Sequence, residues 1–381
     1  MLLVYCAAVH AFHGGRRLAE RVLIVGSGPL ARTIIHELDA RPNSRQLVLG
    51  IVEDGASGGP LPKRCLRLGD SERLAEIIED FKPDRIIVAP GERRGQMPLQ
   101  KLLEPWVRGI VVEDGVAVCE RLTGKLAIEA ITPSSFIFSK DFRKSPLDAA
   151  ARRAVSLSVA AIGSLLTAPL CLLIAVLIRL ESPGPVLFVQ ERVGASGRPF
   201  RLLKFRTMRL ATGRTSEWVR DNGDRITRLG FWLRKFRLDE LPQFVNVLRG
   251  DMDVVGPRPH PVSNYQLLVL VTRNAPQCGD KIPFYTLRSL VRPGITGWAQ
   301  VRYGYANDVE EETEKIRYDL YYVKHRSLWL DLRILLDTIR IVLLGHGADR
   351  VVPGMNSRAS APAMGSAAGV GAGGRMASGS S

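Results

Sequence analysis

A run of 25 residues without a charged side chain, 154–178, limits the possible folds of this chain more than any other feature. The hydrocarbon core of a bilayer takes about 20 residues of helix to cross, so the run is long enough to span a membrane. Pro169 lies near its middle, where a proline removes a backbone hydrogen bond and kinks a helix. The sequence therefore predicts a membrane segment in the centre of the chain, kinked at Pro169.

Basic residues flank this run on both sides, namely Arg143, Lys144, Arg152, Arg153, Arg179 and Arg192. A helix that spans a membrane normally carries its positive charge mainly on one side. Positive charge at both ends favours a re-entrant hairpin that enters and leaves the bilayer at the cytosolic face. A simple spanning helix and a buried helix of a soluble domain are the alternatives.

The first part of the chain alternates short apolar runs with helical patterns. A helical pattern covers residues 74–81, and the expected strands are residues 22–25, 47–52, 85–89 and 109–112. Strands that alternate with helices are typical of a parallel, doubly wound sheet. We therefore expect a Rossmann-like accessory domain over residues 21–140. It follows an apolar N-terminal stub, residues 1–20, whose apolar run is too short to cross a bilayer.

A relaxed dinucleotide-binding pattern follows the first expected strand. Gly26, Gly28 and Ala31 have the spacing at which glycines let a backbone approach a pyrophosphate at a helix N-terminus. Glu53 or Asp54 stands where a ribose-binding acid is expected. Such turns also occur in sheets that bind nothing, so a structural or regulatory domain is the other interpretation. The alternative function is a membrane-attached NAD-dependent sugar-nucleotide oxidoreductase or dehydratase. That function needs a Tyr-x-x-x-Lys pair, and the expected accessory domain contains no tyrosine.

The chain has a large surplus of positive charge, with 53 basic against 38 acidic residues and a net charge of +15. Residues 192–237 alone hold 13 basic and 3 acidic residues. A surplus of this size calls for a polyanionic partner. Next to a membrane segment, the expected partners are anionic lipid headgroups and phosphorylated substrates. Nucleic acid is not expected, because no recognised binding module is present.

Two adjacent acids, Asp239 and Glu240, stand in this basic part of the chain. A proline is tolerated in the first turn of a helix, so Pro242 predicts a helix that begins at about Asp239. A helix N-terminus favours anions and can hold both a carboxylate and an incoming phosphate. Successive helical residues point about 100° apart, so the two acids are expected to do different jobs, such as nucleophile and metal ligand. The alternative is that Asp239 only caps the helix.

Two further patterns point to phosphate. A rigid Gly-Pro turn at Gly256 and Pro257 precedes Arg258, an arrangement that can fix a guanidinium for bidentate contact with a phosphate. Residues 200–208 alternate basic and apolar side chains, as a half-buried or edge strand does. Together with the two acids, these patterns indicate a site for a phosphorylated substrate.

Eight short blocks, in order along the chain, resemble the bacterial sugar transferase family, the monotopic polyprenyl-phosphate phosphoglycosyl transferases. The blocks are ESPGPV (181–186), QERVG (190–194), KFRTM (204–208), LDELPQ (238–243), NVLRGD (246–251), VGPRP (255–259), PGITGWAQV (293–301) and WLDL (329–332). The preceding domain, with GERRG at 91–95, is similar to the regulatory domain of long, exopolysaccharide-type members. The resemblance thus extends over nearly the whole chain apart from the tail.

The resemblance implies an α/β fold in which a Rossmann-like parallel-sheet domain precedes a mostly α catalytic domain. The catalytic domain would cover residues 149–347, with a re-entrant membrane helix hairpin at 154–178. The implied reaction begins when an aspartate attacks the β-phosphate of a UDP-sugar and UMP leaves; polyprenyl phosphate then takes the sugar phosphate. The implied location is the bacterial inner (cytoplasmic) membrane, with the catalytic domain on its cytosolic face. Residues 354–381, rich in Gly, Ser and Ala, are expected to be disordered.

By the same resemblance, Asp239 matches the nucleophile and Glu240 its acidic partner, which is associated with Mg²⁺. The residues that match substrate- or phosphate-binding positions are Lys204, Arg206, Thr207, Gln243, Pro257 and Arg258. The chain departs from the family at the kink, where Ala168 stands in place of the usual serine before Pro169. It also departs at its start, where long members have a transmembrane bundle. A non-catalytic assembly protein is a further alternative, and the sequence leaves the sugar and a homo-oligomeric state open.

Overall fold

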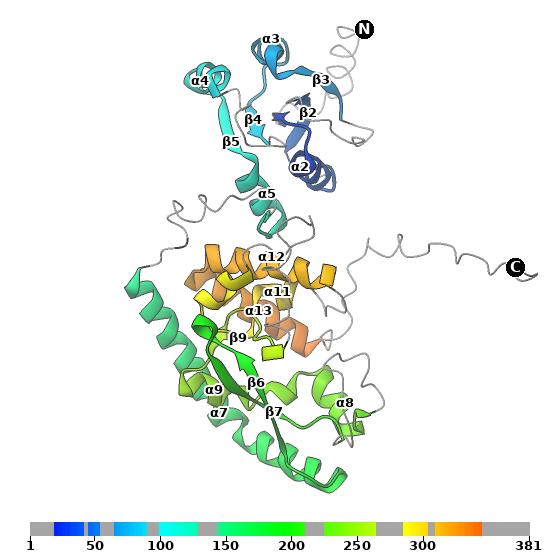
Figure 1. The fold of residues 1–381 in the computed structure, drawn as a ribbon, viewed down its shortest axis with the longest axis vertical. Helices are drawn as coiled ribbons and strands as arrows, with labels where there is room; N and C mark the ends of the chain where they lie inside the picture. Colours follow the sequence, from blue (N-terminus) through cyan, green and yellow to red (C-terminus); the bar gives the residue numbers. More distant parts are fainter. Residues whose placement is uncertain are drawn as a thin grey trace, which may run out of the picture.

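The computed structural model describes residues 19–41, 45–53, 65–89, 99–128, 142, 145–209, 225–263, 285–303 and 309–344. They form a sheet domain and a larger C-terminal domain (Figure 1). The expected tail, the GERRG block and nearly all of the expected stub lie outside the described residues.

The sheet domain is built on five parallel strands in the order β3-β2-β1-β4-β5. The strands are β1 (Glu20–Val25), β2 (Gln46–Glu53), β3 (Arg67–Asp70), β4 (Arg85–Val88) and β5 (Val111–Asp114). The sequence-based prediction of a parallel sheet is therefore confirmed. Strand β3 was missed because its sequence, Arg-Leu-Gly-Asp, has a single apolar residue and no alternation to detect.

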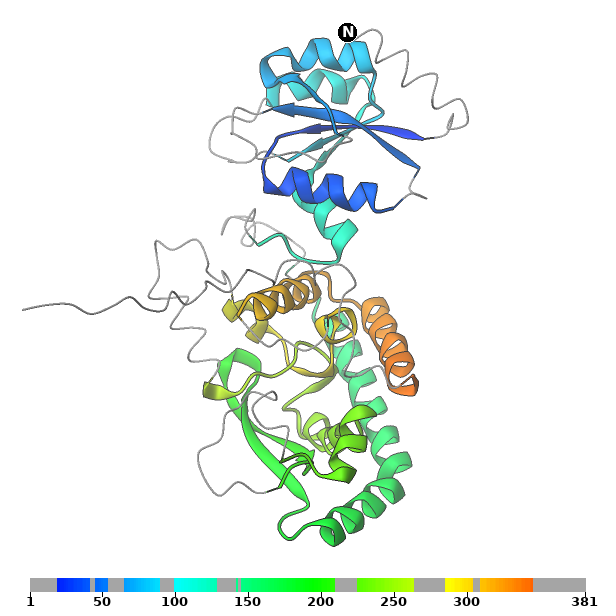
Figure 2. The same ribbon diagram turned by 90° about the vertical axis from the view of Figure 1, so that its right-hand side faces the viewer.

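Helices cover both faces of this sheet (Figure 2). On one face lie α2 (Pro29–Asp39) and α5 (Gly115–Thr123); on the other lie α3 (Leu74–Phe81), which η1 (Ser71–Arg73) precedes, and α4 (Leu99–Val107). Side chains of a strand alternate between faces, so Val22 and Ile24 of β1 pack with α2, whereas Leu23 and Val25 pack with α3. All four are at most 1% exposed, and the domain has two closed apolar layers.

The C-terminal domain combines one long helix with short helices and two small sheets. In chain order its elements are α7 (Pro146–Glu181), β6 (Leu187–Val193), η3 (Ala195–Gly197), β7 (Pro199–Phe205), α8 (Arg228–Lys235), η5 (Leu238–Glu240), α9 (Gln243–Arg249), β8 (Asp253–Val255), η6 (Tyr285–Leu290), β9 (Gly294–Thr296), α11 (Trp298–Arg302), α12 (Val309–His325) and α13 (Leu328–Leu343). Strands β6 and β7 form an antiparallel hairpin, and β8 pairs with β9 in parallel. The core brings together α7, α9, α12 and α13 around Met252, Tyr322 and Ile334.

The segment expected to form a re-entrant hairpin is one continuous helix. Helix α7 runs from Pro146 to Glu181 with Pro169 in its interior. It bends but does not double back (Figures 1 and 2). Thr167 Oγ1 donates to the Gly163 carbonyl at 2.7 Å, the kind of bond that bends a helix without breaking it. The predicted hairpin is therefore not seen in this structure.

Two of the flanking charges that favoured a hairpin, Arg152 and Arg153, have partners inside the protein. Arg152 Nε lies 2.8 Å from Asp331 Oδ2, and its Nη2 donates to the Tyr322 hydroxyl at 2.7 Å. Arg153 Nη1 lies 2.7 Å from Asp253 Oδ1. Both arginines tie the start of α7 to the C-terminal core, and neither is an anchor for lipid headgroups. Sequence alone could not separate these roles, because the partner acids are far away along the chain.

The middle of α7 is apolar and exposed. Among the described residues, α7 is the one helix that by length and composition could cross a membrane. Only 11% of its most apolar stretch of 18 residues is buried inside the protein. Leu165 and Leu166 are 77% and 72% exposed. Exposed leucines in such number on one helix are unlike the surface of a water-soluble domain. They suit a protein that is associated with a membrane.

The sheet domain meets the C-terminal domain through the end of α5 and the residues after it. Glu120 of α5 is 2% exposed and pairs with Lys324 Nζ at 2.7 Å. Trp298 Nε1 donates to the Gly124 carbonyl at 2.8 Å, and Leu126 N donates to the Arg317 carbonyl at 3.0 Å. The contact therefore falls on α11 and α12 of the C-terminal domain.

Candidate active site

The two adjacent acids lie in a tight turn between α8 and α9. Asp239 and Glu240 belong to the 3₁₀ turn η5, and α9 begins at Gln243 with Pro242 as its N-cap. A helical turn therefore begins at about Asp239, as predicted, but it is a 3₁₀ turn, and the α-helix itself begins only at Gln243. The turn is entered through Arg237, whose φ of 55° is left-handed and costly for a side chain with a Cβ. Asp239 does not cap α9, so the capping alternative is excluded.

Glu240 receives two cationic groups from distant parts of the chain. Lys204 Nζ of β7 lies 3.1 Å from its Oε1, and Arg258 Nη2, from the turn after β8, lies 3.0 Å from the same oxygen. Glu240 is 8% exposed. Burial pushes the pKa of Glu240 upward, but the charges of Lys204 and Arg258 outweigh it and hold that pKa well below its usual range. Glu240 is thus a carboxylate at neutral pH.

Asp239 has the opposite environment. It is 8% exposed, and among the described residues no side chain makes a hydrogen bond or ion pair with its carboxylate. Burial, followed by the neighbouring negative charge of Glu240, raises the pKa of Asp239 to about 6. Two neighbouring carboxyl groups with pKa values pushed apart are suited to different tasks. At neutral pH Asp239 is a desolvated carboxylate, the state that a nucleophile needs.

The Arg258 turn is held by close backbone contact. Gly256 N donates to the Thr296 carbonyl at 2.9 Å, and Gly294 N donates to the Pro257 carbonyl at 2.9 Å. A Cβ on Gly294 would lie 2.0 Å from Gly256 N, so that position accepts glycine alone. Strands β8 and β9 therefore fix the place from which Arg258 reaches Glu240.

Arg206 and Thr207, which were also singled out in the sequence, make contacts that hold the fold together. Arg206 is buried, and its guanidinium donates to the Pro183 and Ser182 carbonyls at 2.8 and 2.7 Å, at the end of α7. Thr207 is also buried, and its carbonyl accepts from Thr227 N. The structure therefore uses these two residues to join α7, β7 and α8, and does not bring Arg206 to Glu240.

Gln243 and Pro169 complete the predicted set. Gln243 is 3% exposed in the first turn of α9, directly after the acidic pair. Pro169 lies in the exposed middle of α7. The structure thus brings together Lys204, Asp239, Glu240 and Arg258, with Pro257 and Gln243 beside them in the chain.

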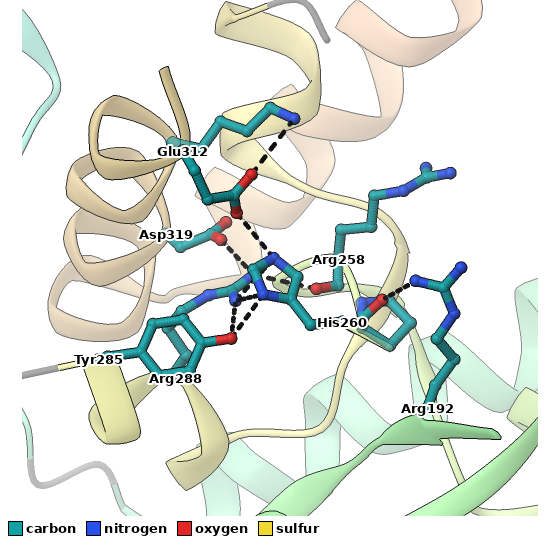
Figure 3. A network of polar contacts seen from close by, with 9 residues as sticks. Arg192, Arg258, His260, Tyr285, Arg288, Glu312 and Asp319 are labelled. Carbon is teal, nitrogen blue, oxygen red and sulfur yellow. Dashed lines mark hydrogen bonds and ion pairs between the residues drawn. The ribbon is translucent and has the colours of Figure 1, made fainter. Parts of the chain in front are cut away.

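A buried polar network behind Arg258 was missed in the sequence (Figure 3). Its members are His260, Tyr285, Arg288, Glu312 and Asp319. They come from the Arg258 turn, η6 and α12. Tyr285, Arg288, Glu312 and Asp319 all lie outside the eight sequence blocks that resemble the family. The signal available in the sequence was weak: α12 is a highly charged helix, and charged helices are usually solvated faces.

The ionisation states within this network follow from burial and the neighbouring charges. Burial, followed by the Arg288 charge, lowers the pKa of His260 to about 4, so the ring is neutral at pH 7. Burial alone would raise the pKa of Glu312, but its contact with His260 and the charges of Lys315 and Arg288 lower it to about 2. His260 Nε2 therefore donates to Glu312 at 2.9 Å, and its Nδ1 accepts from the Tyr285 hydroxyl at 2.5 Å.

A divalent metal fits this site only with help from substrate. The described residues include no group of three or more His, Cys, Asp or Glu side chains that could hold a metal ion. Mg²⁺ is usually bound by one or two carboxylates, water and substrate phosphates, not by an all-protein cage. Two neighbouring carboxylates, with both cations placed on one oxygen of Glu240, match such a donor set. The residues present are therefore compatible with Mg²⁺.

Within the described part of the chain, the site combines a buried carboxylate without a side-chain partner, a second carboxylate paired with two cations, and an arginine on a rigid turn. Such an arrangement of acids and cations is suited to a phosphorylated substrate. The family model described as "Bacterial sugar transferase" matches residues 147–345. The chain therefore belongs to the bacterial sugar transferase family.

Curated relatives narrow this class. The chain is 44% identical over 232 residues to a UDP-N-acetylgalactosamine-undecaprenyl-phosphate N-acetylgalactosaminephosphotransferase of Aeromonas hydrophila, with 61% of this chain and 52% of the relative aligned. It is 33% identical over 347 residues to an undecaprenyl-phosphate glucose phosphotransferase of Komagataeibacter xylinus, with 87% and 61% aligned. A UDP-glucose:undecaprenyl-phosphate glucose-1-phosphate transferase of Caulobacter vibrioides is 44% identical over 211 residues, with 55% and 72% aligned. The aligned part of the chain thus spans 52% and 61% of the length of the first two of these relatives.

Proposed function

We propose that this protein transfers a sugar 1-phosphate from a UDP-sugar to undecaprenyl phosphate, releases UMP, and thereby starts the synthesis of an exopolysaccharide or glycoconjugate. One observation carries the proposal: Lys204 and Arg258 converge on Glu240, while the buried carboxylate of Asp239 has no side-chain hydrogen bond or ion pair among the described residues. The names of the relatives support the acceptor and the type of group transferred.

In the first step, an Asp239 oxygen attacks the β-phosphorus of the UDP-sugar. A bond forms from that oxygen to phosphorus, and the bond to the bridging oxygen breaks, so UMP leaves with the electron pair. In the second step, an oxygen of the polyprenyl phosphate attacks the same phosphorus. The bond to Asp239 then breaks and the carboxylate is regenerated. Splitting the transfer in this way replaces one difficult step with two easier ones.

The surrounding residues neutralise charge that moves during both steps. The Arg258 guanidinium and Lys204 ammonium, which pair with Glu240, would contact the phosphate oxygens of the donor, because preorganised cations of this kind stabilise a transferring phosphoryl group. Glu240 would hold Mg²⁺ together with the diphosphate, and the metal would neutralise charge on the leaving UMP. In this account Glu240 orients the cations and Asp239 makes the bond.

The same account places the protein at the cytosolic face of the bacterial inner membrane. The exposed leucines of α7 would contact lipid, and the acceptor phosphate would meet the site at the membrane surface. The nucleotide sugar is water-soluble, so the site has to be open to the cytosol. Both substrates can then reach one carboxylate at the interface.

The oxidoreductase alternative has less support. Glu53, a candidate ribose-binding acid at the end of β2, pairs with Arg67 of β3 at 3.1 Å. A ribose would have to compete with that ion pair. The sheet domain also has no tyrosine for the hydride-transfer chemistry that this function needs.

The proposal is tested with the full chain in nanodiscs, UDP-sugar donors, undecaprenyl phosphate and Mg²⁺. Release of UMP in multiple turnovers should require both the donor and the acceptor. Asp239→Asn should lower the rate by roughly 10³-fold or more, because the nucleophile is lost. Asp84→Asn, at a surface ion pair of the sheet domain, is the matched control and should keep the full rate. An Asp239→Asn enzyme with the normal rate would exclude the assigned nucleophile.

A further inference from the structure

The Arg258 turn has an unusual hydrogen-bonding problem. Pro257 and Pro259 have no N–H groups, so the turn cannot satisfy its carbonyls by local backbone pairing. Each of the four carbonyls from Pro257 to His260 instead accepts a bond from elsewhere. Gly294 N donates to the first, and Val193 N donates to the last, both at 2.9 Å.

Side-chain guanidinium groups hold the two carbonyls in the middle. Arg288 Nη2 donates to the Arg258 carbonyl at 2.9 Å, and Arg192 Nη1 donates to the Pro259 carbonyl at 3.1 Å (Figure 3). The first of these bonds is accepted by the backbone carbonyl of Arg258, the residue whose side chain pairs with Glu240. The backbone position of Arg258 therefore depends on Arg288.

Arg288 is itself held in place by buried partners on α12 and in the turn. Its Nη2 lies 2.6 Å from Asp319 Oδ2, and these two side chains are 8% and 2% exposed. Its Nη1 donates to the Tyr285 hydroxyl at 3.4 Å, and that hydroxyl is fixed in turn by His260. A buried guanidinium with this many partners has little freedom to move.

We infer that Arg288 is a positioning residue for the proposed transferase reaction, which acts by holding the backbone of Arg258 so that its guanidinium faces the transferred phosphate. This inference rests on the proposed function. Arg288 need not contact the substrate. Asp319 and Tyr285 hold the guanidinium, and the guanidinium holds the turn. Because phosphoryl transfer is catalysed mainly by positioning and charge, a displaced arginine is expected to slow the reaction strongly.

A double-mutant cycle separates positioning from a general loss of stability. Arg288→Lys keeps a positive charge, but the shorter lysine lacks the planar fork with which the guanidinium holds Asp319, the Arg258 carbonyl and Tyr285 together. This change should lower kcat/KM for the donor about 10- to 100-fold in the otherwise native chain. In a chain that already carries Arg258→Lys, the same change should lower it less than about threefold, because the group that it positions is already impaired.

Arg153→Lys is the matched control. Arg153 also donates to backbone carbonyls, those of Met252 and Val247, both at 2.7 Å, and pairs with Asp253, but it does not contact the Arg258 turn. Whatever its effect on kcat/KM, that effect should be equal in the native and the Arg258→Lys backgrounds. Equal losses from Arg288→Lys in both backgrounds would overturn the inference.

A second variant protects the test against misfolding. Arg288→Met combined with Asp319→Leu removes both buried charges together, so neither is left unpaired. It should melt close to the native chain and still lose activity about 10-fold or more. Full activity in this variant would also overturn the inference.

The same double-mutant cycle is measured a second time on the affinity for UDP, by calorimetric titration of the chain in nanodiscs. Arg288→Lys should weaken UDP binding in the native background and have little effect in the Arg258→Lys background. Absence of UMP release from the native chain would contradict the proposed function, and the affinity cycle would still decide the role of Arg288. Normal turnover with additive effects would contradict the positioning role alone.

Discussion

The sheet domain and the C-terminal domain place apolar and charged side chains in opposite ways. In the sheet domain, Leu23 and Ile24 are fully buried, and ion pairs such as Arg21–Asp84 lie at the surface. In the C-terminal domain, Leu165 of α7 is 77% exposed, while Glu240 and its cationic partners are largely buried. Exposed apolar patches and buried charges are the features of a fold that carry information about function. Under the proposed function, these features of the second domain serve its contact with lipid and with phosphate.

The largest expected difference between the domains is in the effect on activity when one cation is removed from each. Arg258→Ala should lower kcat/KM by about 10²–10³-fold, because a preorganised charge next to the transferred phosphate is lost. Arg85→Ala is the matched change in the sheet domain, where Arg85 pairs with Glu20 at 2.8 Å and also contacts Glu113. It should leave the UMP release rate unchanged. Equal losses from the two variants would remove the distinction between the domains.

The difference in the burial of apolar side chains is tested by replacing one such side chain in each domain with alanine. Ile24→Ala, in the closed core of the sheet domain, should destabilise it by about 2–5 kcal/mol through lost burial and the cavity that remains. Leu165→Ala should change stability in detergent by no more than about 0.5 kcal/mol, since its side chain makes few contacts within the protein. Urea or thermal unfolding followed by circular dichroism measures both. A large loss from Leu165→Ala would mean that α7 packs against protein at that position.

The smallest expected effect is that of pH on the two carboxyl groups of the site. Burial and Glu240 raise the pKa of Asp239 to about 6, so the nucleophile is ionised above that pH and protonated below it. The single-turnover rate should therefore be nearly level from about pH 7 to 8 and fall about tenfold per unit well below pH 6. Glu240 stays ionised throughout, because Lys204 and Arg258 overcome the effect of burial on its pKa. A rate that is level down to about pH 5 would contradict the raised pKa of Asp239.

Local patterns were enough to predict most of the sheet domain. Strand β1 and helix α3 follow directly from an apolar run and a helical period, and α3 covers the expected residues 74–81. The prediction failed where local sequence is silent. Strand β3 has one apolar side chain, and its place at the edge of the sheet is set by pairing with β2.

Around α7 and the site, long-range partners decided what the sequence could not. The charge of Arg152 and Arg153 favoured a hairpin, but Asp331 and Asp253 neutralise those side chains within the protein. The resemblance to a known family singled out Lys204, Glu240 and Arg258 one by one, yet only the fold brings them to one carboxylate oxygen. The network behind Arg258 had no motif at all, because its partners come from η6 and α12.

The central claim is that Asp239 becomes covalently linked to the sugar phosphate. The most direct test is intact-protein mass spectrometry of the full chain in nanodiscs, incubated with a UDP-sugar and Mg²⁺ in the absence of undecaprenyl phosphate. The account predicts that the native chain gains the mass of one sugar phosphate, that peptide mapping places it on Asp239, and that adding undecaprenyl phosphate removes it. It predicts no gain for Asp239→Asn. UMP release without any added mass on the native chain, or an equal gain in the Asp239→Asn chain, would contradict it.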